Sequence, residues 1–140
     1  MSGQVKPPVW YWIVASLAVL WNGFGVMNYL RQAYSKAQVI AEQPPEMQPY
    51  FENIPAWATA GFAIAVFGGL LGSVLLLIRK GPIQLLFIAS LLGVFMQNTY
   101  WIFLSGIERT PSLMALPVSV ILVCILLILL SRKAKNSGWI

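Results

Sequence analysis

The sequence predicts an all-α, polytopic membrane protein: a four-transmembrane-helix bundle with a short interfacial helix in its first outer loop. Three observations predict this fold. Hydrophobic residues make up 59% of the 140 residues and charged residues only 9%, whereas a soluble domain carries about 25% charged residues. Four apolar segments each approach the ~20 residues that cross a bilayer. Lysine and arginine concentrate in the connections on one side of the membrane. We therefore expect one membrane domain over residues 1–140.

The residue inventory excludes several classes of chemistry. The chain has no histidine, no aspartate and a single cysteine, Cys124. A His-ligated metal or haem, a Ser-His-Asp triad and an intramolecular disulfide are therefore excluded. We expect a protein that is not an enzyme and that holds no metal and no cofactor.

The first apolar segment is expected to be a retained helix. Its apolar run is too long for a cleaved signal peptide, and no small-residue cleavage site follows it. The four spans cover roughly residues 10–30, 56–78, 83–104 and 113–130, and the first outer loop covers 31–55.

Glycine and proline mark the helix ends. Gly81 suits the position just after the second helix, and Pro82 suits the first turn of the third. Thr110 and Pro111 provide an N-cap and a first helical residue for the fourth helix. Pro117 lies inside that helix and is expected to kink it, because it removes one backbone hydrogen bond.

Basic residues predict the orientation. With four spans, both termini and the connection at 79–82 share one side of the membrane. Six of the nine basic residues lie on that side, and all four glutamates lie on the other. Because cytoplasmic loops are enriched in Lys and Arg, we expect both termini in the cytoplasm. The net charge of +5 then reflects topology and requires no nucleic-acid partner. The six basic residues are Lys6, Arg79, Lys80, Arg132, Lys133 and Lys135; the glutamates are Glu42, Glu46, Glu52 and Glu108.

The outer loop divides into two parts. The stretch RQAYSKAQVIAE contains good helix formers, so we expect it to prolong the first helix until Pro44 stops it. The stretch MQPYFENIPAW predicts a short helix in the headgroup region, with Pro49 in its first turn. That helix is either a lid packed over the bundle or a surface that docks a partner. Its apolar stripe consists of Met47, Tyr50, Phe51, Ile54 and Trp57.

Polar residues interrupt the first and third spans. At about 100° per residue, Asn22 falls on one face of the first helix with Asn28 on its shoulder. Gln97 and Asn98 lie similarly on the third helix, and Glu108 joins that stripe if the helix continues. Both helices run outward, so we expect the four amides in the outer half of the membrane. The accompanying aromatic residues are Trp21, Tyr29 and Trp101.

These amides have two alternative roles. An unpaired amide in hydrocarbon costs several kcal/mol, so each needs a partner. As interhelical glue, each bond contributes about 0.6 kcal/mol. As a water-accessible pocket, the amides and aromatic faces suit a neutral polar ligand or a lipid headgroup. In both cases we expect Asn22 and Gln97 to approach each other across a contact between the first and third helices, directly or around shared water or ligand.

Small residues recur along the second span. At this spacing they allow helix backbones to approach closely. The pattern predicts tight packing, against a helix of the same chain or of another. The helix-packing stripe consists of Gly61, Ala65, Gly68 and Gly72, and a line of four-residue spacing adds Gly69 and Ser73.

Three stretches carry a resemblance to a known family: PPVWYWIVASLAVLWNGFGVMNYL, YFENIPAWATAGFAIAVFGGLLGSVLLLIRK and the terminal RKAKNSGWI. With these stretches the chain resembles an uncharacterised family of small four-span inner-membrane proteins of Gram-negative bacteria, sometimes labelled "sugar transporter". The resemblance implies a multi-pass protein of the bacterial inner membrane and supplies no catalytic or binding residues. Members often carry aspartate where this sequence has Asn28.

We therefore expect a non-enzymatic membrane protein that binds, or facilitates the transport of, a small neutral polar ligand or lipid through the outer-half polar cluster. No span has an ionisable residue at its middle, so the ion coupling of many carriers is not expected. The alternative is an accessory or scaffolding subunit that packs with itself or with a larger membrane complex. Besides the lipid bilayer, the expected partners are that ligand, a second copy or a membrane protein.

Overall fold

The computed structural model describes residues 5–106 and 110–140. These residues form helices and connections, without a strand. The all-α class and the four-helix bundle expected from the sequence are confirmed. The expectation that Glu108 extends the polar stripe of the third helix lies outside the described residues.

Four helices are each long and apolar enough to cross a bilayer, as a multi-pass membrane protein requires. The second and third have the bounds expected from the sequence, whereas the first and fourth extend further toward solvent. The four are α1 (Val9–Tyr34), α4 (Ala56–Ile78), α5 (Ile83–Thr99) with its π-helical continuation η1 (Tyr100–Leu104), and α6 (Pro111–Asn136).

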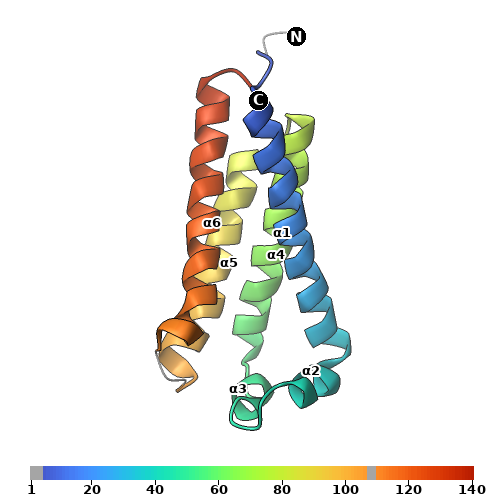
Figure 1. Cartoon of the computed structure of the whole chain (residues 1–140), viewed down its shortest axis with the longest axis vertical. Coiled ribbons are helices and arrows are strands. Elements are labelled where there is room, and N and C mark those ends of the chain that lie inside the picture. The colour runs from blue at the N-terminus through green and yellow to red at the C-terminus, as the bar shows by residue number, and fades with distance from the viewer. Residues whose placement is uncertain (1–4, 107–109) are drawn as a thin grey trace.

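Figure 1 shows both termini at one end of the bundle and the short helices α2 (Lys36–Glu42) and α3 (Gln48–Glu52) at the other. We call these the terminal end and the loop end. Helix α4 packs against α1 on one side and α5 on the other, and α6 packs against α5. Toward the terminal end, α1 and α6 contribute to one core with α4 and α5. Toward the loop end, the core draws on α4, α5 and α6 but not on α1.

The small-residue stripe of α4 lies against α5 of the same chain. A Cβ at Gly61 would lie 2.8 Å from the carbonyl oxygen of Gly93, and a Cβ at Gly93 would lie 2.6 Å from that of Gly61. A Cβ at Gly68 would lie 3.3 Å from the Leu86 carbonyl oxygen. The two backbones are therefore in direct contact, which only small residues permit. Ala65 and Gly72 complete this buried face.

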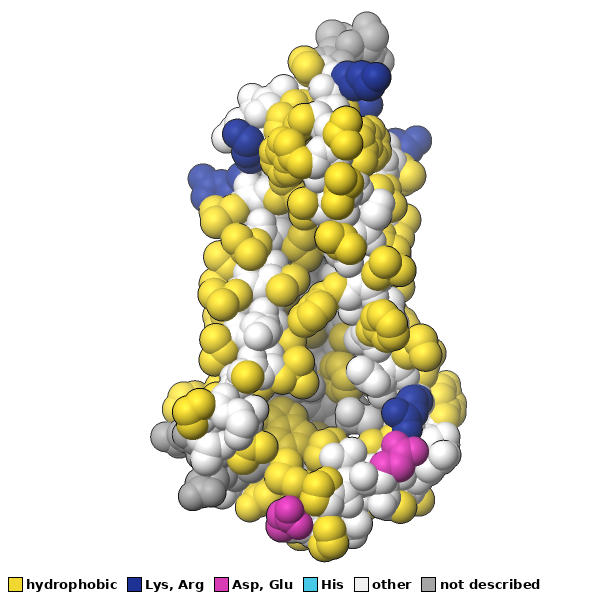
Figure 2. Space-filling view, in the orientation of Figure 1, with side chains coloured by type: hydrophobic (Ala, Val, Ile, Leu, Met, Phe, Trp, Pro, Cys, Tyr) yellow, Lys and Arg dark blue, Asp and Glu magenta, His cyan; other side chains and the backbone are white. Residues whose placement is uncertain are grey.

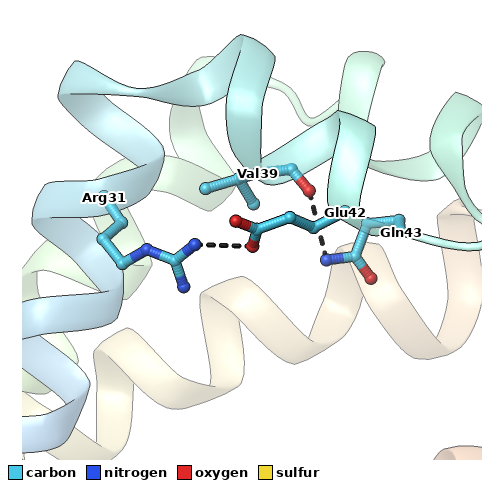
Figure 3. A network of polar contacts seen from close by, with 4 residues as sticks. All are labelled: Arg31, Val39, Glu42 and Gln43. Carbon is cyan, nitrogen blue, oxygen red and sulfur yellow. Dashed lines mark hydrogen bonds and ion pairs between the residues drawn. The ribbon is translucent and has the colours of Figure 1, made fainter.

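The connection after α1 differs from the sequence expectation. Helix α1 was expected to run on to Pro44, but it ends at Tyr34, and Ser35 leaves the helical region (φ −132°, ψ 40°) before α2 begins. Beyond the apolar span α1 has no core to follow, and turning the chain at Ser35 buries Val39. Figure 3 shows Arg31 pairing with Glu42 across this bend, with Nη2 and Oε2 2.6 Å apart. Both side chains are about half exposed, so the pair directs the bend and adds at most about 1 kcal/mol.

Helix α3 has Pro49 in its first turn, as expected, but forms a single turn of helix. It packs against the loop end of the third span. The Tyr100 hydroxyl donates to the Tyr50 carbonyl oxygen at 2.7 Å, and the Phe51 and Trp101 rings meet edge to face with centroids 5.1 Å apart. The segment therefore lies as a lid over this part of the bundle.

The terminal end is closed by contacts between distant segments. The Arg79 guanidinium donates to the carbonyl oxygens of Trp139 and Val5, each at 2.7 Å. The Trp139 ring packs edge to face on Trp10 and Tyr11. The Tyr11 hydroxyl donates at 2.6 Å to a carbonyl near the end of α4, that of Leu76. We call this set of contacts the terminal clasp.

Gly81 was expected just after the second helix, but Arg79, two residues earlier, takes the capping position. The left-handed cap of α4 is Arg79 (φ 63°), while Gly81 (φ 96°) follows in the turn. A left-handed conformation costs a non-glycine residue about 1–2 kcal/mol. The two hydrogen bonds of the Arg79 side chain in the terminal clasp offset that cost. At the start of α6, Thr110 caps the helix as expected, accepting from Leu113 N at 3.3 Å.

Candidate ligand-binding site at the loop end

A cavity of about 440 Å³ lies between α1, α4, α5 and α6 toward the loop end. Small-molecule sites usually measure about 300–1,000 Å³, so its size suits a ligand. Figure 2 shows the hollow between α1 and α6, where the two helices do not close on each other.

The cavity is long rather than round. Its wall on α5 and η1 runs from Phe87 to Trp101, which corresponds to about 21 Å at 1.5 Å per residue. Polar side chains lie toward the loop end, and apolar side chains form the deeper part. The polar or aromatic lining includes Trp21, Asn22, Asn28, Gln32, Gln97, Asn98 and Trp101, and the deep lining includes Phe87, Val94, Val123, Cys124 and Leu127.

Asn22 has a structural role. Of the two expected arrangements with Gln97, the direct hydrogen bond is not formed, whereas both residues line the same cavity. Its Nδ2 donates to the Ser73 hydroxyl at 3.2 Å and to the Ala18 carbonyl oxygen at 2.9 Å. Its Oδ1 packs against Gly69, where any Cβ would collide with it. The partner helix is therefore α4. Helix α4 packs against both α1 and α5, so the expected contact between the first and third spans is replaced by two contacts through α4.

Asn98 also bonds within the protein. It is 7% exposed, and its Nδ2 donates to the Pro117 carbonyl oxygen at 3.4 Å. This long bond links α5 to α6 at the proline. Deeper in the wall, the Ser90 hydroxyl donates to the Ala65 carbonyl oxygen at 2.6 Å. Asn98 and Ser90 therefore donate their hydrogen bonds to carbonyl oxygens of neighbouring helices.

Three other amides have no such partner. Within residues 5–106 and 110–140, no protein group forms a hydrogen bond with the side chains of Asn28, Gln32 or Gln97, and all three line the cavity. Asn28 is exposed and Gln32 and Gln97 are partly exposed, so none of the three is enclosed in the protein core. Gln32 was not predicted as a site residue, because the first span was expected to end at residue 30. The four-residue spacing from Asn28 to Gln32 was the available signal.

Of the three aromatic residues expected at the site, two line the cavity and one does not. Trp21 and Trp101 line the cavity. Tyr29 is not part of its wall, and packs instead edge to face on Phe62 and Phe67 with centroids 5.6 Å away. Trp101 follows the change from α-helix to π-helix, marked by a 2.6 Å bond from Ser105 N to the Tyr100 carbonyl oxygen. This wider turn was not foreseen, and such turns recur at functional sites.

The described wall of the cavity carries no charged side chain. It offers neutral donors and acceptors at one end and hydrocarbon along the rest. The arrangement can hold and orient a hydroxyl, ester or amide group, with apolar groups placed deeper.

Comparison with known proteins found no matching family model, no matching curated protein and no matching solved structure. The geometry of the cavity therefore carries the functional argument.

Proposed function

We propose that this chain is a non-enzymatic protein of the bacterial inner membrane that binds a small neutral polar ligand or a lipid in the loop-end cavity, and facilitates its passage. One observation carries the proposal: Asn28, Gln32 and Gln97 reach a cavity of ligand size without a protein partner.

Amides at membrane depth need a partner. An amide left unpaired in hydrocarbon costs several kcal/mol. Asn22 and Asn98 avoid it by bonding to neighbouring helices. Asn28, Gln32 and Gln97 satisfy their donors and acceptors only through water or a bound molecule, as expected for a recognition site.

Charge supports an orientation with both termini in the cytoplasm and the cavity in the outer half of the membrane. Figure 2 shows most of the visible basic side chains around the terminal end, and the acidic ones at the loop end, where one basic side chain also lies. Cytoplasmic segments carry the excess of Lys and Arg. A periplasm-active reporter fused after Ile140 should give no signal, and strong activity would reverse the orientation.

The scaffolding alternative, which used the small-residue stripe of α4 and the long outer loop, loses the first of these two supports. The stripe contacts α5 backbone atoms of the same chain. Binding in the cavity is therefore the better supported function.

Native mass spectrometry of the full chain, gently extracted from membranes, tests the proposal. We expect a retained neutral ligand or lipid that is lost when Asn28→Leu and Gln97→Leu are combined. The matched control is Gln84→Leu, which removes an amide from the same helix as Gln97 but outside the cavity. A retained mass that is equal in all three proteins, or absent in all, would refute the proposed site.

A further inference from the structure

We infer that the ligand is an amphiphile with one slender apolar chain and a neutral hydrogen-bonding headgroup, and that it reaches the cavity sideways from the bilayer between α1 and α6. This inference rests on the proposed function and adds the ligand class and the route. It follows from the rim of the cavity, its lid and its polarity gradient.

The rim is mainly apolar and lies at membrane depth; its polar member is Asn28, which also lines the cavity and is exposed. Phe24 on α1 and Leu116 on α6 line the cavity and are nevertheless 66% and 67% exposed. Trp21 and Leu113 combine the same two properties. A side chain that is both lining and exposed belongs to the mouth. Because these four residues lie within the spans, the mouth faces acyl chains and not water.

The loop end of the cavity is narrowed by the lid. Met47 and Phe51 form part of the cavity wall. The ring of Phe51 rests on Trp101, and the Tyr100 hydroxyl holds the backbone of the same turn. A water-soluble ligand arriving from the aqueous side meets this packed turn, whereas a lipid-soluble molecule meets an open flank.

The polarity gradient matches the direction of a lipid in the bilayer. Gln32 lies in the last turns of α1, close to the membrane face, and Asn28 lies one turn deeper. Phe87 and Leu127 line the opposite, apolar part of the cavity. A headgroup among the amides thus places its chain along the membrane normal, as in the bilayer itself. A compact sugar would fill only the polar end and leave most of the 21 Å length empty.

Photolabelling tests both parts of the inference. The probe is a monoacylglycerol with a diazirine in its chain, added to the full-length protein in phosphatidylcholine vesicles, and labelled residues are mapped by mass spectrometry.

Helix α6 supplies an internal standard, because one face lines the cavity and the other is exposed to lipid. We expect labels on both faces. Monooleoylglycerol at about ten times its Kd should reduce cavity labels about tenfold, while glycerol should not. The cavity face carries Val120, Cys124 and Leu127; the lipid face carries Leu122, Leu126 and Leu129.

Two matched variants test whether the labels that monooleoylglycerol reduces lie in the cavity. Val120→Trp fills the cavity and should abolish them, whereas Leu122→Trp, two residues away on the lipid face, should leave them unchanged. Labels confined to the lipid face would overturn the inference. Displacement by glycerol as effective as that by monooleoylglycerol would also overturn it, because the chain would then contribute nothing. In either case a ligand retained in native mass spectrometry and lost on amide substitution would leave the proposed function standing.

Discussion

The two ends of this bundle use the same helices and differ in whether α1 and α6 belong to one core. At the terminal end both helices contribute to the core that lies beside the terminal clasp, and Ala15 and Ala134 are fully buried there. At the loop end the core draws on α4, α5 and α6, while Phe24 of α1 and Leu116 of α6 line the cavity and are largely exposed. The same four helices thus form a closed core at one end and a cavity at the other.

Amide side chains have two different roles in this bundle. Asn22 lines the cavity and bonds to Ser73 of α4. Gln97 lies beside the cavity without a protein partner. Asparagine and glutamine in a span are therefore glue where a neighbour lies within reach, and candidate binding groups where none does.

The largest effect should come from removing the α4–α5 contact on which both ends depend. Gly93→Leu places a side chain where even a Cβ would lie 2.6 Å from the Gly61 carbonyl oxygen. We expect the free energy of unfolding in detergent to fall by about 3 kcal/mol or more. The control is Gly23→Leu on α1, where nothing lies within 4 Å of a Cβ. Equal stability of the two variants would show that the helices are not in contact at Gly93.

A second prediction compares one residue type at the two ends. Trp139→Ala removes the edge-to-face contacts with Trp10 and Tyr11 and should cost about 2 kcal/mol. Trp21→Ala removes a rim residue that is 41% exposed and should cost about 1 kcal/mol or less. Unfolding of both variants in the same detergent gives the ratio. A larger loss at Trp21 would mean that the loop end is packed more tightly than the terminal end.

The sequence determined the fold class because membrane-spanning segments need only length and apolar content. The bounds of α4 follow from Pro55 before it and the basic turn after it, so they were predictable. Helix periodicity placed Asn22 on a face. It did not reveal which helix that face meets, because the order of packing is a property of the whole bundle. Gly69 and Ser73 were visible as a line of small residues, and only the structure shows that they face α1.

Two local features of the loop end were not predicted. The break at Ser35 accompanies the burial of Val39, which is a tertiary effect that overrides helix propensity. The π-helical turn begins at Tyr100, whose hydroxyl donates to the Tyr50 carbonyl oxygen, 50 residues away in the chain. No local sequence pattern encodes either long-range contact.

A smaller effect should distinguish glue from site at Asn22. In a double-mutant cycle of Asn22→Ala and Ser73→Ala, we expect a coupling energy of about 0.6 kcal/mol, typical of a hydrogen bond between membrane helices. Equilibrium unfolding in detergent gives the free energies of unfolding of the parent, the two single variants and the double variant. No coupling would place the Asn22 amide elsewhere, and would remove the distinction drawn here between Asn22 and Gln97.

The smallest effect is expected at Gln97. Because its side chain has no protein partner, Gln97→Leu should change the free energy of unfolding by less than about 0.5 kcal/mol. The same variant should weaken ligand retention, which stability alone does not report. A loss of more than about 1 kcal/mol would indicate a protein hydrogen bond, and Gln97 would then be structural.

Inserting one bulky side chain at each end tests whether the loop end is hollow and the terminal end closed. Val120 lines the cavity and Ala134 is fully buried beside the terminal clasp, both on α6. The measurement is the free energy of unfolding of Val120→Trp and Ala134→Trp in the same detergent. We expect Val120→Trp to stay within about 1 kcal/mol of the parent and Ala134→Trp to lose about 3 kcal/mol or more, because there is no space for the ring. Equal losses at the two positions would show that the two ends do not differ in this way.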